Sequence, residues 1–425
     1  MKKILFVGIN ARYVHSNPVL FYLRKLSTGK AETAIAEYTT SQYSYDILAD
    51  IYGYQPEIIA MSVYIWNSKL VRELLPEMKK ILPETRIVLG GPEVSFNSQQ
   101  WLDSYDSIDF IVTGGGEQAW LKLLTKDFDY PERIVRIPNL SLSEIPFPYS
   151  EKDIKLLKNR IIYYESSRGC PYHCSYCLSS REDNILEFRG WDRVRTELFF
   201  FMEYEVPLVK FVDRTFNADP HYARKVWSFL SKENPNTRFH FEINPYLLTE
   251  EDITLLETVP ANLFQFEIGV QSTNNRVLSE INRQGEWPVV KEKIAPLLQR
   301  SNIPVHLDLI FGLPYDDRES ARKSFNDIYA LQPDHLQPGM LKVLPGTVLA
   351  DKTQEYDLVY QQEAPYKVFS NKWISFPELL SLQNIEHLVN NLYNSHHFPR
   401  TLQNLTSLSR SLQSLLKTGR ILACQ

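Results

Sequence analysis

Short apolar runs alternate with helical patterns along the first 125 residues of the chain. The apolar runs lie at residues 3–8, 33–39, 57–63, 86–90 and 109–113. Between them, residues 67–82 and 117–125 repeat apolar positions at the spacing of one helix face. Strands that alternate with helices are typical of a parallel, doubly wound sheet, whose ligands bind beyond the carboxyl ends of the strands. We therefore predict an α/β domain of Rossmann or flavodoxin type over residues 1–130.

Residues 131–158 interrupt this alternation. They contain prolines at positions 131, 138, 146 and 148 and show little periodicity, a composition typical of a linker. Apolar runs then return at residues 161–165, 207–213, 238–243, 263–270, 303–310 and 334–343. Six strands with helical segments between them predict a partial (β/α)6 barrel of the TIM type over residues 159–350. Beyond that barrel the pattern is helical, so we expect a helical C-terminal region over residues 351–425.

Length and charge limit the classes of protein to which the chain can belong. With 425 residues, 44% of them hydrophobic, it has enough apolar material for more than one core. The formal net charge of -5 argues against strong nonspecific binding to nucleic acid. No stretch approaches the roughly 20 apolar residues that cross a bilayer, and the N-terminal apolar run stops at Asn10 without a signal-peptide pattern. We expect a cytoplasmic protein with no membrane segment.

Three of the four cysteines lie within eight residues, just after the first strand predicted for the barrel. Cys170, Cys174 and Cys177 have the spacing Cys-x3-Cys-x2-Cys. A [4Fe-4S] cluster normally takes four thiolates, so three thiolates would leave one iron open to an external ligand. Buried structural cysteines, a zinc site that adds His173, and a redox-active thiol pair are the alternatives. The crowding of the cysteines and the absence of paired Cys-x2-Cys spacings favour the cluster.

The cysteine spacing, with Tyr176 in the aromatic position before the last cysteine, resembles the signature of the radical S-adenosylmethionine superfamily. The resemblance implies that the open iron chelates the amino and carboxylate groups of S-adenosylmethionine. It also implies that an external low-potential reductant of the flavodoxin or ferredoxin type supplies an electron, which cleaves S-adenosylmethionine to methionine and a 5'-deoxyadenosyl radical. We therefore expect an enzyme, with no side chain yet assigned to catalysis.

Segments 211–217, 241–247, 267–283 and 307–316 resemble the strand motifs that follow in that superfamily. The resemblance implies that Asp213 contacts the amino group of S-adenosylmethionine. Other candidates contact the ribose, the carboxylate or the adenine ring. The full set implied for S-adenosylmethionine is Tyr176, Asp213, Asn244, Gln271, Ser272, Arg283, Ile310 and Gly312. Two alternatives stay open: Asp213 could cap the following helix, and Arg283 could be a solvated surface charge.

A doubly wound domain ahead of such a barrel resembles the cobalamin-binding domain of cobalamin-dependent radical enzymes. The resemblance lies in segments 61–67, 88–96 and 111–120. The residues it implies for cobalamin are Asn10, His15, Ser62, Gly90, Gly91, Glu93, Gly114 and Glu117. The Asp-x-His-x-x-Gly pattern that supplies a histidine to cobalt is absent, so His15 is a weak candidate and a loop histidine is the favoured interpretation.

The combined resemblance covers about residues 1–400 and points to a subgroup with an appended C-terminal domain of unknown function. The last residues depart from it, so we expect a truncated or altered C-terminal region. We expect S-adenosylmethionine and cobalamin to serve in methylation of an unactivated carbon of a small molecule or peptide. Cyclisation or oxidative rearrangement, as in an anaerobic porphyrin cyclase, is one alternative. A non-catalytic cobalamin or iron-sulfur sensor and a radical enzyme without cobalamin are the others.

Overall fold

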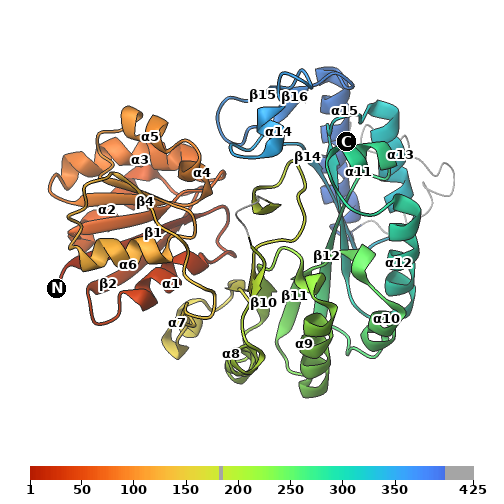
Figure 1. The fold of residues 1–425 in the computed structure, drawn as a ribbon, viewed down its shortest axis with the longest axis horizontal. Coiled ribbons are helices and arrows are strands. Elements are labelled where there is room, and N and C mark those ends of the chain that lie inside the picture. The colour runs from red at the N-terminus through yellow and green to blue at the C-terminus, as the bar shows by residue number, and fades with distance from the viewer. Residues whose placement is uncertain (181–184, 398–425) are drawn as a thin grey trace. The chain divides into compact units, whose positions relative to one another are not determined.

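The computed structural model describes residues 1–180 and 185–397 (Figure 1). The chain forms two compact units. Of the described residues, the first unit comprises 1–164 and 187–210, and the second comprises 165–180, 185–186 and 211–397. The first unit thus includes a second segment of the chain, residues 187–210, which follows the cysteine loop. The boundaries predicted at residues 130, 158 and 350 remain predictions.

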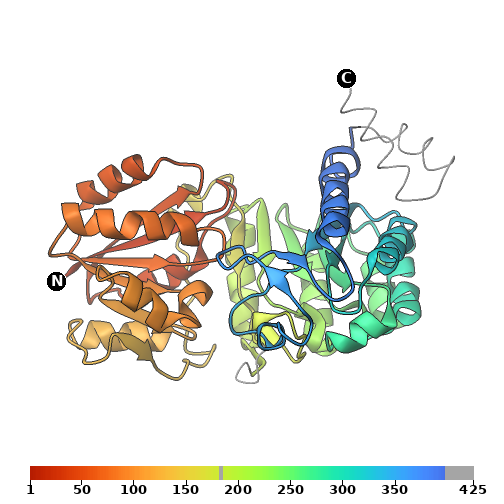
Figure 2. The ribbon, with the colours of Figure 1, turned by 90° about the horizontal axis from the view of Figure 1, so that it is seen from above.

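The first unit contains a six-stranded sheet with the order β2-β1-β3-β4-β5-β6. Its adjacent strands are parallel, and Figure 2 shows helices on both faces of this sheet. The strands are β1 (Lys3–Asn10), β2 (Glu32–Thr39), β3 (Ile58–Ser62), β4 (Arg86–Gly90), β5 (Phe110–Thr113) and β6 (Ile134–Arg136). The helices are α1 (Pro18–Leu26), α2 (Ser44–Tyr54), α3 (Ser68–Ile81), α4 (Pro92–Ser95), α5 (Ser98–Ser104) and α6 (Glu117–Thr125). The predicted doubly wound domain is confirmed.

Burial explains why these segments form strands at the centre of the sheet. Every residue of β3 is buried, and so is every residue of β1 except its first. Such continuous apolar runs are expected where helices cover both faces of a parallel sheet. The edge strand β2 is only partly buried.

The stretch predicted as a linker has structure of its own. It contains β6 and α7 (Glu151–Leu156), and Leu142 and Ile145 are completely buried. Helix α8 (Trp191–Glu203) joins this unit through Phe201, whose ring packs against Phe147 and Tyr149. Single buried side chains without a repeating pattern leave no periodic signal in the sequence, which is why residues 131–158 resembled a linker.

A second six-stranded sheet has the order β14-β13-β12-β11-β10-β7. Its strands are β7 (Ile162–Tyr164), β10 (Leu208–Phe211), β11 (Arg238–Glu242), β12 (Phe264–Gln271), β13 (Val305–Phe311) and β14 (His335–Met340). The connecting helices are α9 (Pro220–Glu233), α10 (Glu250–Glu257), α11 (Asn275–Glu280), α12 (Trp287–Arg300) and α13 (Arg318–Tyr329). Strands that neighbour one another in chain order and are joined by helices confirm the predicted partial barrel.

Side chains alternate strictly along β12 and β13, where buried positions alternate with half-buried ones. The buried face is apolar and includes Phe266, Leu307 and Leu309. The opposite face carries polar side chains, among them Glu267 and Asp308. The apolar face packs under the helices and forms the core. The polar face is the one on which ligand-binding groups can lie.

The region after residue 350 is not purely helical. After α14 (Val348–Asp351), an antiparallel pair of short strands, β15 (Val359–Tyr360) and β16 (Val368–Ser370), precedes α15 (Phe376–Leu388). Asn394, just beyond the π-helical turn η4 (Val389–Tyr393), exchanges two hydrogen bonds with the backbone of Leu336 in β14. The predicted helical tail beyond residue 397, with Cys424, lies outside the described residues.

The remaining short elements are strands β8 (Ser167–Arg168) and β9 (Glu187–Phe188) and 3-10 turns η1 (Leu178–Ser180), η2 (Phe216–Ala218) and η3 (Pro245–Leu247). Among the helices of the described ranges, none combines the length and the apolar character needed to cross a membrane.

Candidate functional site

The three clustered cysteines line one cavity of about 250 Å³ in the second unit. The cavity lies at the carboxyl ends of β11 and β12, where a barrel of this type places its functional groups, and it reaches Asp308 in the middle of β13. Its other lining residues are Tyr172, Tyr176, Arg214, Thr215, Glu242, Ile243, Asn244, Glu267, Gly269, Gln271, Arg283 and Asp308. The structure therefore brings the cysteines together with polar residues from three strands.

A glycine begins the loop that carries the cysteines. Gly169 has a φ of +94°, and a Cβ there would lie 2.4 Å from the carbonyl oxygen of Ile185. Only glycine tolerates both conditions. Further along, the amide of Ser175 donates to the carbonyl of Ile281, and the amide of Cys177 donates to that of Cys174. These bonds hold the loop against the barrel.

The cysteine thiols share a cavity without converging on one point. Within the described ranges, no three His, Cys, Asp or Glu side chains are placed to hold a single metal ion. His173 is exposed and does not line this cavity, which disfavours the alternative in which it completes a zinc site. In a [4Fe-4S] cluster each thiolate binds a different iron. The donor set and its spread therefore suit the cluster.

Arg283 supplies positive charge beside the cysteines. Its guanidinium lies 3.8 Å from Sγ of Cys174 and also donates a hydrogen bond to the carbonyl of Gly269. Burial raises the pKa of the Cys174 thiol, and the guanidinium opposes that rise. A cation in this position favours the thiolate form that an iron cluster needs. Arg283 is thus part of the cavity wall and not a solvated surface charge.

Asn244 and Gln271 line the cavity, as does Tyr176. The backbone of Asn244 exchanges two hydrogen bonds with the side chain of Asn217, which fixes its position after β11. Gln271 ends β12 with a φ of +70°, and its buried Oε1 has no hydrogen-bond partner among the described residues. A buried acceptor without a partner is rare in proteins. A ligand in the cavity would satisfy it, so this part of the wall fits a bound S-adenosylmethionine.

Asp213 does not line the cavity. Its carboxylate is buried and accepts hydrogen bonds from the amide and the hydroxyl of Ser166, at 3.0 and 2.7 Å. It also does not cap the helix that follows, because Asp219 fills that position for α9. Asp213 therefore fixes the segment that leads into Cys170, and the contact with an amino group remains a prediction.

The other three residues predicted for S-adenosylmethionine also lie outside the cavity wall. Ser272 is fully buried, and its hydroxyl accepts from the amide of Asn274 and lies 3.3 Å from that of Ser324. Ile310 and Gly312 are not among the residues that line the cavity. The structure thus gathers half of the predicted set around the cysteines.

The sequence analysis missed three carboxylates of the cavity wall, Glu242, Glu267 and Asp308. Each occupies an inward position of a strand whose outward positions are apolar. His240 lies two residues before Glu242 in β11, on the same face of the strand. Its Nε2 lies 2.9 Å from Oε2 of Glu267. Polar residues at every second position of these strands, such as Gln265 and Glu267 in β12 or His306 and Asp308 in β13, were the available signal.

The pKa of Asp213 yields a pH prediction. Burial raises the pKa of this carboxyl from 3.8 to about 6, against the effect of hydrogen bonds from Ser167 and Ser166. Between these values the folded chain binds more protons than the unfolded chain, so stability is present at low pH and is lost as pH rises through 6. From pH 5 to pH 7 we expect Asp213 to contribute a loss of about 1 kcal/mol in the free energy of unfolding.

Urea unfolding of the chain without cofactors, at both pH values, measures this loss. The variant Asp213→Asn should show a shallower decline than the unmodified chain. Burial also raises the pKa of Asp316, to about 7, so only the difference between variant and unmodified chain isolates Asp213. If the free energy of unfolding falls equally with pH in both proteins, the pH dependence does not come from Asp213.

In the first unit, the residues predicted for cobalamin lie at the carboxyl ends of the parallel strands. Asn10, which ends β1, donates from Nδ2 to Glu37 and to the carbonyl of His15. Ser62, which ends β3, accepts a hydrogen bond of 2.6 Å from Asn17. The strand ends of a parallel sheet form its ligand edge, so the fold places these residues where the sequence predicted.

Two buried polar atoms at this edge lack partners among the described residues. They are Oδ1 of Asn17, beside Ser62, and Oγ1 of Thr113, which ends β5. Buried polar groups are rarely left unpaired without a ligand or water. This edge therefore fits a bound group with several hydrogen-bonding atoms, such as the cobalamin that the resemblance implies.

The remaining predicted residues differ in their environment. Nδ1 of His15 lies 2.7 Å from the hydroxyl of Tyr163. Burial, with the nearby charges of Arg12 and Lys210, lowers the pKa of His15, which keeps the imidazole neutral near neutral pH. Glu93 is buried and accepts from Ser68, and Glu117 is buried at the start of α6. Gly114 has a φ of +83° in the turn before α6.

Gly90 and Gly91 are predicted to differ sharply in their tolerance of alanine. Gly91 has a φ of +103°, and a Cβ there would lie 2.5 Å from the carbonyl oxygen of Val63. A Cβ on Gly90 would meet nothing closer than 3.7 Å. We expect Gly91→Ala to cost about 2 kcal/mol or more in unfolding free energy and to weaken cobalamin retention.

The matched variant Gly90→Ala should fall within about 0.5 kcal/mol of the unmodified chain. Urea unfolding and the corrinoid absorbance of purified protein measure the two effects. If both variants have the same free energy of unfolding, the close approach of Gly91 to Val63 does not contribute to stability.

Comparison with known proteins identifies three regions of the chain. A B12 binding domain model matches residues 4–124, and a radical SAM superfamily model matches residues 164–328. A third model, a protein of unknown function (DUF4080), matches residues 354–412. The order of these regions is that predicted from the sequence.

Two curated relatives are methyltransferases. The cobalamin-dependent radical SAM methyltransferase TokK of Streptomyces tokunonensis is 24% identical over 352 residues, which are 72% of this chain and 50% of TokK. The 2-(S-pantetheinyl)-carbapenam-3-carboxylate methyltransferase of Streptantibioticus cattleyicolor is 24% identical over 376 residues, 77% of this chain and 53% of that protein. The chain thus spans about half the length of these relatives.

Two solved structures share the fold. The methyltransferase TsrM of Kitasatospora setae, with cobalamin and a [4Fe-4S] cluster bound, aligns with a TM-score of 0.68 and 17% identity over 83% of this chain and 78% of that one. The radical enzyme OxsB, with aqua-cobalamin and S-adenosylmethionine bound, aligns with a TM-score of 0.71 and 14% identity over 100% of this chain and 75% of that one.

The matching domains confirm the predicted cofactors, since the radical domain implies a [4Fe-4S] cluster with S-adenosylmethionine and the domain before it implies cobalamin. Enzymes of this superfamily also need an external reductant. With both domains matched in this order and the cysteines gathered in one cavity, the chain carries a B12-binding domain followed by a domain of the radical S-adenosylmethionine superfamily.

Proposed function

We propose that the chain is a cobalamin-dependent radical methyltransferase that acts on an unactivated carbon. The observation that carries this proposal is the presence of both cofactor domains in one chain. Two relatives, TokK and the carbapenam methyltransferase, are themselves named as methyltransferases. We infer that the substrate is a small molecule or a peptide, and that the reductant is of the flavodoxin or ferredoxin type.

When bound, the cluster with S-adenosylmethionine supplies a 5'-deoxyadenosyl radical for hydrogen abstraction, and cobalamin supplies a methyl group. In our proposal Cys170, Cys174 and Cys177 hold the cluster. Arg283 balances the negative charge of the thiolates, because its guanidinium lies beside Cys174. Gln271 offers an unpaired acceptor to the ligand.

We propose that the carboxyl edge of the first sheet holds the cobalamin. Ser62, Asn17 and Thr113 offer hydrogen-bonding atoms there, two of them without partners in the described part of the chain. Close to Ser62, the indole of Trp66 stacks on Tyr64 at 4.4 Å and donates from Nε1 to the carbonyl of Ile9. Trp66 remains 48% exposed, which leaves an aromatic surface for a flat macrocycle.

An anaerobic assay tests the proposal. Chain reconstituted with iron, sulfide and cobalamin is given S-adenosylmethionine and a strong reductant, and its products are separated by chromatography. We expect both 5'-deoxyadenosine, from radical formation, and S-adenosylhomocysteine, from methyl transfer to cobalamin. Formation of 5'-deoxyadenosine alone would favour cyclisation or rearrangement over methylation. A correctly loaded chain that forms neither product would be a sensor and not an enzyme.

A further inference from the structure

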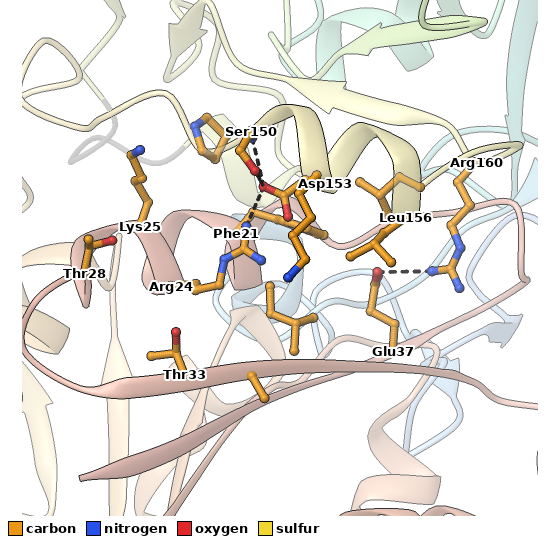
Figure 3. A pocket seen from close by; sticks show the side chains of 15 residues that line it. Phe21, Arg24, Lys25, Thr28, Thr33, Glu37, Ser150, Asp153, Leu156 and Arg160 are labelled. Atoms are coloured by element: carbon orange, nitrogen blue, oxygen red, sulfur yellow. Dashed lines mark hydrogen bonds and ion pairs between the residues drawn. The ribbon is translucent and has the colours of Figure 1, made fainter. Parts of the chain in front are cut away.

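A trough of about 670 Å³ runs beside strand β2 of the first unit (Figure 3). Helix α1 and strand β2 form two of its walls, and residues 148–160, around α7, form the third. Its apolar lining includes Phe21, Ile35 and Leu157. The volume is in the range of sites that bind ligands.

Strand β2 is the free edge of its sheet. It pairs with β1 through all eight of its residues without a shift of register, and no other strand of the described chain pairs with it. Natural sheets protect such edges with lysine, proline or a bulge. The sequence of β2, ETAIAEYT, has no lysine and no proline. Four of its residues, Thr33, Ala34, Ile35 and Glu37, line the trough, so an extended chain lying in the trough would run beside this strand.

Both acidic side chains of the trough are already neutralised. The carboxylate of Asp153 is buried, bonds to Ser150 and pairs with Arg24 at 2.6 Å. Glu37 accepts from Asn10 and Asn17 and pairs with Arg160 at 3.1 Å. Figure 3 shows these two ion pairs at separate places along the wall.

The basic side chains of the trough outnumber these acids. Lys25 and Lys152 also line it, and neither has an acidic partner in the part of the chain that the structure describes. The trough therefore carries an excess of positive charge along the side of the open strand. An anionic chain would gain from this charge as it approaches.

We propose that β2 is a docking edge that accepts an extended, acidic segment of a partner protein as an added strand. Backbone hydrogen bonds to β2 would give affinity, and the lysines would select acidic side chains. The inference goes beyond the proposed function and does not depend on it.

Two other occupants fit less well. A second copy of the chain paired through the same edge would bring the lysines of both copies together, at an electrostatic cost. The chain's own residues 398–425 contain Arg400, Arg410, Lys417 and Arg420 and no acidic residue, so they would be repelled. Charge complementarity thus points to an acidic partner.

The test uses the full chain and a fluorescent eight-residue peptide of alternating glutamate and valine, as long as β2. We expect binding by fluorescence anisotropy, and slower hydrogen exchange at the amides of residues 33–37. The double variant Lys25→Glu, Lys152→Glu should weaken binding at least tenfold. The control Lys69→Glu, Lys291→Glu changes the net charge equally outside the trough and should bind as the unmodified chain does.

A peptide with the same side chains and methylated backbone nitrogens separates strand addition from simple charge attraction. It should not bind, because it cannot pair with β2. Equal binding of the methylated peptide, unchanged exchange in β2, or no binding of the first peptide would overturn the proposal. Dimerisation in solution that the peptide fails to reverse would identify a second copy as the occupant and would also overturn it.

Discussion

Replacement of Cys174 by alanine should lower the formation of 5'-deoxyadenosine by more than roughly 10³-fold. Cys174 is buried in the cavity wall and is the cysteine that Arg283 contacts. With only Cys170 and Cys177 left, the loop has two thiolates for a cluster that needs at least three from this chain. The cluster should be lost, so iron and sulfide content measured after reconstitution should fall together with the product.

The control for this variant is Cys424→Ala, which changes the fourth cysteine of the chain. It should keep full iron content and activity, since the cluster requires only the loop cysteines. The melting temperature of the Cys174 variant, compared with the unmodified chain without iron, separates cluster loss from misfolding. Normal iron content in the Cys174 variant would refute the assignment of this cysteine as a ligand.

Replacement of Arg283 by glutamine should lower the rate of S-adenosylmethionine cleavage by about 10- to 100-fold. The guanidinium lies 3.8 Å from Sγ of Cys174, and it also donates to the carbonyl of Gly269 near the carboxyl end of β12. Because reduction adds an electron to an anionic cluster, loss of a nearby positive charge makes reduction harder. We therefore expect the midpoint potential of the cluster to become more negative.

A redox titration followed by electron paramagnetic resonance measures this potential. Arg276→Gln is the matched control, since Arg276 stacks on the ring of Tyr315 at 4.0 Å and does not line the cavity. It should leave both the potential and the rate unchanged. If Arg283→Gln slows cleavage without a shift of potential, then Arg283 acts through the position of Gly269 and not through its charge.

The elements and the cysteine loop could be predicted because their signals are local in the sequence. Apolar runs of strand length marked both sheets, and three cysteines within eight residues marked the cavity. Asp213 shows the limit of such signals. Its partner Ser166 lies 47 positions earlier in the chain, and nothing local distinguishes a carboxylate that fixes a loop from one that contacts a ligand.

Other differences had weaker but real signals. Glu242, Glu267 and Asp308 stand at alternate positions of apolar strands, which predicts that they share one face. The stretch 131–158 resembled a linker because its buried side chains, such as Leu142 and Ile145, follow no repeat. Local periodicity therefore revealed the regular elements, whereas single contacts between distant segments required the structure.

Each barrel strand has an outward face that stabilises the fold and an inward face that carries the polar groups of the site. The outward face packs aromatic rings under the helices, as in the contacts of Phe241 in β11 with Phe216 and with Trp227 in α9. The inward face is polar, with His306 beside His335 at a ring separation of 4.6 Å. Substitutions on the inward face remove little apolar packing, so evolution can alter them at small cost to folding. A barrel built in this way can change its substrate while its scaffold stays the same.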